Sequence, residues 1–274
     1  MEGAIIVEQR KHDVSETRAG TCSLSPLEGT LIIPLVVRAM AHPWCPWWNP
    51  GDLSARVALK RLGWQCQQWV PDAWTVGFIL WRTHRLRQLG AEFFVKHPDA
   101  LGVNLGAGLS DYFQWLCNGT NTWLDTDLPD VMQLRKECLP QRDTLACEMS
   151  LDLRQPENCK AAMSHAKDQK VPVWMMCEGV MLYMKPRQVH QILAVLASIA
   201  PEGSEVVFDF IPNWMVGTTI RSPLDAQQSA PFQWGLTSVS EVEDIHPRLR
   251  VRGVEWCMPA NPYSPYGLMK LTIQ

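Results

Sequence analysis

Residues 101–129 read LGVNLGAGLSDYFQWLCNGTNTWLDTDLP, and they carry the clearest information about the fold class. A short apolar run, Leu101–Leu105, leads directly into the glycine turn Gly106-Ala107-Gly108. A second run, Thr122–Asp125, ends in the acidic sequence Asp125-Thr126-Asp127. Apolar runs of this length, separated by a stretch with helical spacing, predict a strand, a helix (Leu109–Leu116) and a second strand in a βαβ unit.

The same alternation continues toward the carboxyl terminus. We expect further strands at Thr144–Met149, Val171–Cys177 and Glu205–Phe210, separated by helices at Pro129–Cys138, Pro156–Asp168 and Pro186–Ile199. Strands alternating with helices of ten or so residues predict a parallel sheet covered on both faces. After a short helix at Val239–Asp244, the runs Leu249–Cys257 and Leu268–Ile273 are joined by a loop alone, which predicts an antiparallel pair. The expected fold is a doubly wound α/β sheet of five parallel strands closed by a carboxyl-terminal hairpin.

The chain before this pattern has a different character. Residues 1–20 are mixed polar and are expected to form a loose terminus, and residues 21–95 read as helical and irregular, with helical spacing at Leu53–Leu62 and Thr75–Leu89. We expect 21–95 to form a helical cap over the carboxyl ends of the strands, and 96–274 to form the core. The Trp-rich part of the cap offers Trp44, Trp47 and Trp48 as walls of a substrate pocket, although bulky aromatics are more often core residues.

Composition narrows the function classes. The 274 residues are 46% hydrophobic and 19% charged, with a formal net charge of −3. A mildly acidic chain without a long basic run argues against nucleic acid or an anionic membrane as partner. The nine cysteines form no C-x-x-C pair, so we expect reduced thiols, no metal site and a cytoplasmic location. The sequence leaves the oligomeric state open.

Polar residues follow the predicted strands where an open α/β sheet binds its ligand. Glycines after the first strand allow close approach of a ligand, and Asp125 or Asp127, which follow Gly106 by 19 and 21 residues, can accept hydrogen bonds from a ribose. Asp152 and Glu178 follow the third and fourth strands. This pattern predicts a nucleoside-containing cofactor, but S-adenosylmethionine and NAD(P) share it.

Five segments together resemble the leucine carboxyl methyltransferase family, which includes the tetracenomycin-type polyketide O-methyltransferases. They are Trp81-Arg82-Thr83, Val103–Leu109, Asp125–Val131, Glu178–Tyr183 and Val207–Phe210, in the same order and spacing as in the family. The resemblance implies a class I methyltransferase fold of Rossmann-like type. It also implies an S-adenosylmethionine-dependent enzyme that methylates oxygen of a small acid or phenol.

The resemblance also implies a role for each site residue. Arg82 would bind the methionine carboxylate of the cofactor, and Glu178 its amino group. The turn Gly106-Ala107-Gly108 would lie next to the methionine and ribose portions. Asp127, with Asp125 nearby, would hold the ribose. Asp152 and Leu153 would flank the adenine.

Two questions stay open at the level of the sequence. If the acceptor is a phenol or alcohol, a base would assist, and Tyr183, Glu178, His84 and His97 are the candidates, although His97 precedes a proline in a loop where a surface histidine is the more common outcome. The alternatives to a methyltransferase are an NAD(P)-dependent oxidoreductase, which the expected hairpin disfavours, and a cofactor-binding protein without catalysis. The second is motivated by Ser110-Asp111-Tyr112, where the family often has Asp-Thr-Arg.

Overall fold

The structure is a computed structural model that describes residues 26–41, 46–63, 70–140, 144–169, 171–219, 230–257 and 266–274. The strands are β1 (Leu101–Leu105), β2 (Thr122–Asp127), β3 (Ala146–Ser150), β4 (Val173–Cys177), β5 (Glu205–Phe210), β6 (Leu249–Trp256) and β7 (Gly267–Ile273). The α-helices are α1 (Pro26–Met40), α2 (Leu53–Leu62), α3 (Ala73–Lys96), α4 (Phe113–Leu116), α5 (Pro129–Cys138), α6 (Cys159–Gln169) and α7 (Pro186–Ile199). Short 3-10 helices are η1 (Pro46–Trp48), η3 (Pro156–Asn158), η4 (Met181–Tyr183), η5 (Asn213–Met215) and η6 (Val239–Ile245).

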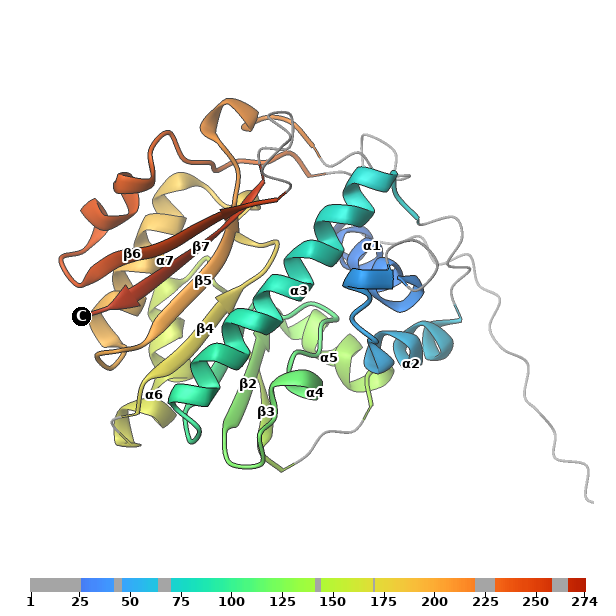
Figure 1. The fold of residues 1–274 in the computed structure, drawn as a ribbon, viewed down its shortest axis with the longest axis horizontal. Coiled ribbons are helices and arrows are strands. Elements are labelled where there is room, and N and C mark those ends of the chain that lie inside the picture. Colours follow the sequence, from blue (N-terminus) through green and yellow to red (C-terminus); the bar gives the residue numbers. More distant parts are fainter. Residues whose placement is uncertain are drawn as a thin grey trace, which may run out of the picture.

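The strands form one sheet in the order β3-β2-β1-β4-β5-β7-β6 (Figure 1). The first five strands in this order pair in parallel, and β7 pairs antiparallel with both β5 and β6. The expectation of five parallel strands closed by a hairpin is therefore confirmed. The last strand of the chain lies inside the sheet, and β6 forms the edge.

Helices cover both faces of the sheet. In Figure 1, α3 crosses in front of the strands, while α6 and α7 lie behind them. The front core packs α3 side chains such as Phe93 and Phe94 against Trp123 and Trp174 of the strands. The rear core joins the apolar faces of α6 and α7 to the opposite side of the same strands.

Four predicted helices differ from those observed. The stretch expected at Thr75–Leu89 is the longer helix α3, Ala73–Lys96, and the helix expected at Val239–Asp244 is the 3-10 helix η6. The helix expected at Leu109–Leu116 is only Phe113–Leu116, because the glycine turn continues through Ser110, whose hydroxyl donates to the Ala107 carbonyl at 2.7 Å. The helix expected at Pro156–Asp168 begins as the 3-10 turn η3 before α6. The helices expected at Leu53–Leu62, Pro129–Cys138 and Pro186–Ile199 have the predicted bounds.

The amino-terminal region divides differently from the predicted cap at 21–95. Helix α3 belongs to the front layer of the sheet from Trp81 onward, where residues such as Phe93 and Phe94 pack on the strands. Helix α1 packs on α2 and on the first turns of α3, and α2 packs on α5. None of the helices in the described ranges is long and apolar enough to cross a membrane.

Capping residues mark where α2 and α3 begin. Asp52 accepts from the Ala55 N–H at the start of α2, and Asp72 accepts from the Trp74 and Thr75 N–H groups at the start of α3. Helix α2 ends at Gly63, whose φ of 63° lies in the left-handed region that glycine adopts without steric strain. These capping residues fix where α2 begins and ends and where α3 begins.

Candidate active site

A cavity of about 440 Å³ opens at the carboxyl ends of β1 to β4. The residues that follow each strand line it: the glycine turn after β1, Asp127 at the end of β2, Leu151–Arg154 after β3 and Glu178–Val180 after β4. Helices α1 and α3 close the cavity from the amino-terminal side. This is the edge where an open α/β sheet binds its ligand, as the sequence predicts.

The glycine turn fits closely against the opposite wall of the cavity. Gly106 has φ of 77° and Gly108 has φ of 50°, both in the region that favours glycine. A Cβ atom on Gly106 would lie 2.4 Å from Cγ2 of Val180, so a side chain there would clash. Both glycines and Ala107 line the cavity, which leaves backbone facing the ligand space.

The two aspartates at the tip of β2 have different surroundings. Asp127 lines the cavity and accepts from the Gly108 and Leu128 N–H groups, each at 2.7 Å. Burial raises the pKa of Asp127, and these two N–H groups work against that rise. Asp127 is therefore the carboxylate that this strand presents to a ligand.

Asp125 lies outside the cavity, which differs from its predicted place in the ribose site. It is fully buried and accepts from Asn104 Nδ2 at 3.0 Å and Trp123 Nε1 at 3.0 Å. Its other oxygen pairs with Arg135 Nη2 at 2.8 Å. Asp125 therefore balances the charge of the buried Arg135 guanidinium.

Arg135 supports the glycine turn, and the sequence reasoning missed it. Its fully buried guanidinium donates to the Gly108 carbonyl at 2.6 Å and the Ser110 carbonyl at 2.8 Å. A signal for it was present in the sequence, because Arg135 shares the apolar stripe of α5 with Val131 and Cys138. An arginine in the middle of a buried stripe needs acceptors in the core.

The segment after β3 brings Asp152 and Leu153 to the cavity as predicted. Leu153 is buried, and Asp152 pairs with Arg154 at 2.8 Å. The hydrogen bonds from Arg154 lower the pKa of Asp152. This corner of the cavity thus combines an apolar side chain with an ionised carboxylate.

Arg82 and Glu178 meet at the inner end of the cavity. Arg82 Nη2 lies 2.7 Å from Glu178 Oε1, and Arg82 Nη1 lies 2.8 Å from Asp209 Oδ2. Burial disfavours the charge of Arg82, but its acidic neighbours, led by Glu178, outweigh burial and raise the pKa of the guanidinium. Arg82 Nε is buried without a hydrogen-bond partner, so one donor of a charged group remains available beside the cavity.

The structure does not bring His84 to the cavity. Two positions along a helix turn by about 200°, so His84 lies on the side of α3 away from Arg82. It is half-buried, and burial followed by Arg87 and Arg85 lowers its pKa. The prediction of His84 as a base at this site is corrected by its position, whereas Tyr183 does line the cavity.

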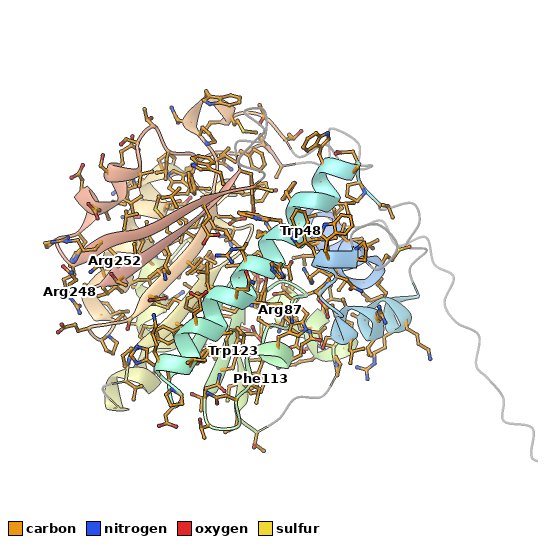
Figure 2. All side chains as sticks on the ribbon, viewed as in Figure 1. Trp48, Arg87, Phe113, Trp123, Arg248 and Arg252 are labelled. Carbon is orange, nitrogen blue, oxygen red and sulfur yellow. The ribbon has the colours of Figure 1, made fainter. Side chains whose placement is uncertain are left out.

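The prediction of tryptophan side chains at the cavity is wrong for Trp47 and Trp48. Trp47 is 72% exposed, and Trp48 packs against the apolar clusters beside α3 (Figure 2). Neither lines the cavity, and Trp44 lies outside the described residues. The aromatic side chains at the cavity are Phe78 and Tyr183. Phe78 precedes Arg82 by one helical turn, which was the available signal.

No group of three or more His, Cys, Asp or Glu side chains within the described ranges is arranged to hold a metal ion. The donors that face the cavity are an arginine, carboxylates and backbone groups.

Comparison with known proteins decides the family. The sequence profile of the leucine carboxyl methyltransferases matches residues 32–197, more than half of the chain. The chain belongs to the leucine carboxyl methyltransferase family. It is 26% identical over 251 residues to the tetracenomycin polyketide synthesis O-methyltransferase TcmP of Streptomyces glaucescens, covering 89% of this chain and 87% of that protein.

Solved structures agree with this fold. A DUF574 family protein of Streptomyces avermitilis matches with a TM-score of 0.52 and 11% identity, covering 81% of this chain and 89% of that one. A protein of Thermobifida fusca assigned to the methyltransferases matches with a TM-score of 0.51 and 16% identity, covering 83% and 99%.

Family membership makes the chain an S-adenosylmethionine-dependent methyltransferase, and the site fits that cofactor. The glycine turn leaves backbone facing the cavity, Asp127 presents a carboxylate to it, and Arg82 has a buried donor without a partner. The sheet argues against the oxidoreductase alternative. The usual dinucleotide-binding fold has six parallel strands, whereas the sheet of this protein ends in the antiparallel strands β7 and β6.

Proposed function

We propose that this methyltransferase transfers the methyl group to a carboxylate oxygen of a small, largely apolar acid. One observation carries the proposal: among the described residues that line the cavity, none is suited to act as a general base. A carboxylate needs no base, because it is already ionised near pH 7. A phenol or alcohol would need one.

The candidate bases at the cavity are either protonated or already paired with another group. Burial raises the pKa of Tyr183, which keeps the phenol protonated and unsuited to accept a proton. Glu178 pairs with Arg82, and Asp152 pairs with Arg154. Asp127 accepts two backbone N–H groups at the ribose end.

Several apolar side chains line the cavity, which supports an apolar acceptor. Leu31 and Pro34 of α1 and Phe78 of α3 line it, together with Tyr183 and Met184 after β4. Apolar and aromatic walls with few polar groups are typical of small-molecule sites. The name of the Streptomyces relative, which refers to polyketide synthesis and O-methylation, points in the same direction.

We assign the cofactor contacts by chemistry. Arg82 would bind the methionine carboxylate and Glu178 the ammonium, since these are the charged pairs that a guanidinium and a carboxylate form. Asp127 would accept from the ribose hydroxyls, and Asp152 with Leu153 would flank the adenine. When bound, the cofactor supplies an electrophilic methyl group on a sulfonium. The residues of the chain then have to align the acceptor with that methyl group and exclude water.

Helices α1 and α2 would act as the cover that excludes water. Arg38 of α1 is buried, lines the cavity, and donates to Asp52 at 2.9 Å and to the Leu109 carbonyl at 3.2 Å. Ser54 of α2 donates to Asp111 at 2.6 Å. These hydrogen bonds connect the two helices to the loop after β1. A conformational change in that loop would therefore move the helices that cover the cavity.

The buried thiols of Cys138, Cys159 and Cys177 suit a reducing compartment. We therefore propose that the enzyme works in the cytoplasm.

The test is chemical. The protein is incubated with methyl-labelled S-adenosylmethionine and a panel of aromatic acids, with the matching phenols as paired acceptors. Mild alkali releases labelled methanol from a methyl ester and leaves a methyl ether, amine or thioether intact. Base-labile label on the acids supports the proposal, and base-stable label overturns the carboxylate assignment. Cofactor binding without transfer to any member of the panel would favour the alternative of a binding protein.

A further inference from the structure

Arg82 belongs to a buried cluster built from four separate parts of the chain. Arg82 comes from α3, Glu178 from the turn after β4, Asp209 from β5 and Tyr266 from the residue before β7. Arg82 Nη1 donates to Asp209 Oδ2 at 2.8 Å and to the Tyr266 hydroxyl at 2.6 Å. The Tyr266 hydroxyl in turn donates to Asp209. Asp209 is fully buried, and neither Asp209 nor Tyr266 lines the cavity.

The donors of Arg82 are divided between these partners and the cavity. A guanidinium carries five N–H donors in a rigid, planar fork. Nη1 is taken by Asp209 and Tyr266, and Nη2 lies against Glu178. Nε is buried and has no hydrogen-bond partner. Because the fork is planar, holding Nη1 sets the direction in which Nε points.

We propose that Asp209 and Tyr266 are positioning residues, which hold Arg82 so that its remaining donors are presented to the carboxylate of the cofactor. This inference rests on the cofactor contacts proposed above. It assigns a role to two residues that do not touch the cavity themselves.

Asp209 also determines the place of Glu178. Both of its carboxylate oxygens accept from the Gly179 N–H, at 2.9 and 3.0 Å. Gly179 has φ of 68° and follows Glu178 directly. One buried carboxylate therefore sets the spacing between the guanidinium and the carboxylate that would bind the two charged ends of the methionine portion.

The charges of the cluster fit a ligand and do not favour a purely structural role. Two carboxylates face one guanidinium, so the four side chains carry a formal excess of one negative charge. A buried excess charge is costly unless a partner compensates it. Bound S-adenosylmethionine would bring one net positive charge, at its sulfonium, while its ammonium would face Glu178 and its carboxylate would face Arg82.

The experiment compares two ligands that differ only in that carboxylate, S-adenosylmethionine and decarboxylated S-adenosylmethionine. Binding is measured by calorimetry for the wild type and for Tyr266→Phe. This substitution removes one hydroxyl but keeps the charge count and the ring, whose centroid lies 4.7 Å from that of Phe78. Loss of a hydrogen bond to a charged group predicts about tenfold weaker binding of S-adenosylmethionine. Binding of the decarboxylated ligand should change by less than about twofold, since Arg82 has nothing to bind there.

Asp209→Asn should likewise weaken S-adenosylmethionine binding relative to the decarboxylated ligand. In an Arg82→Met background, Tyr266→Phe should have no further effect on either ligand, because the hydroxyl acts through Arg82. Ser204→Ala is the control for loss of a buried hydroxyl, since Ser204 bonds the Val173 N–H at the opposite end of the strands.

The outcomes separate the two proposals. If Tyr266→Phe weakens both ligands equally, or leaves both unchanged, the positioning role is overturned while the cofactor assignment stands. If the Arg82→Met protein binds S-adenosylmethionine as tightly as the wild type does, the proposed carboxylate contact itself is wrong, and the positioning role fails with it.

Discussion

Replacing Arg135 by Met tests whether the Asp125–Arg135 pair supports the glycine turn. The substitution keeps much of the side-chain length and leaves Asp125 buried without its cation. Removing one partner of a buried ion pair costs about 3–5 kcal/mol. In a domain of this size about 1 kcal/mol corresponds to roughly 2–4 °C. The expected fall in Tm is therefore about 6–20 °C.

Thermal and urea unfolding of the cofactor-free protein measure the effect. Asp125→Asn should also destabilise the fold, and the double variant Asp125→Asn/Arg135→Met should lose less than the sum of the two single variants, by about 1 kcal/mol or more. Lys136→Met is the matched control, because Lys136 is the exposed neighbour on the same helix and should stay within about 0.5 kcal/mol of the wild type.

Two results would refute this reasoning. One is a decrease in the free energy of unfolding of under about 1 kcal/mol for Arg135→Met, because breaking a fully buried ion pair should destabilise the fold by more than that. The other is an Asp125→Asn protein that keeps its stability but loses cofactor affinity, which would return Asp125 to the ribose site.

Four further predictions concern the cavity. Asp127→Ala should weaken cofactor binding by about 1–3 kcal/mol, whereas the exposed Asp130→Ala should not. Because burial raises the pKa of Asp127, affinity measured between about pH 7 and pH 4 should begin to fall at a higher pH than that of an ordinary aspartate, and an unchanged affinity over this range would contradict the ribose contact. Gly106→Ala should abolish the thermal shift given by S-adenosylhomocysteine, since its Cβ would lie 2.4 Å from a valine side chain and φ is positive; a normal shift would show that the turn tolerates a side chain. Phe78→Ala should raise the KM for the acceptor about tenfold in steady-state assays, while Trp47→Ala should leave it unchanged. If Trp47→Ala raised the KM and Phe78→Ala did not, Trp47 would belong to the acceptor site after all.

The layout of the sheet can be predicted from the sequence alone, and so can the edge at which the cavity opens. Apolar runs alternating with helical stretches specify strands and helices locally, and the absence of a helix between residues 257 and 267 in the sequence pattern predicts the closing hairpin. The turn at Gly106 and the acidic tip of β2 are local signals of the same kind. They follow strands directly, so their place at the carboxyl edge of the sheet needs no knowledge of distant contacts.

Which of these residues face the cavity depends on contacts between elements that are far apart in the sequence. Asp125 and Asp127 lie two positions apart on one strand, so the strand period places both on the same face and cannot distinguish them. Arg135, which reaches Asp125 from the next helix, makes one of them a core partner and leaves Asp127 at the cavity. The same holds for Arg82, whose orientation depends on side chains more than a hundred positions later in the chain, such as Asp209. Contacts of that sequence separation carry no local periodicity, and only packing the elements together reveals them.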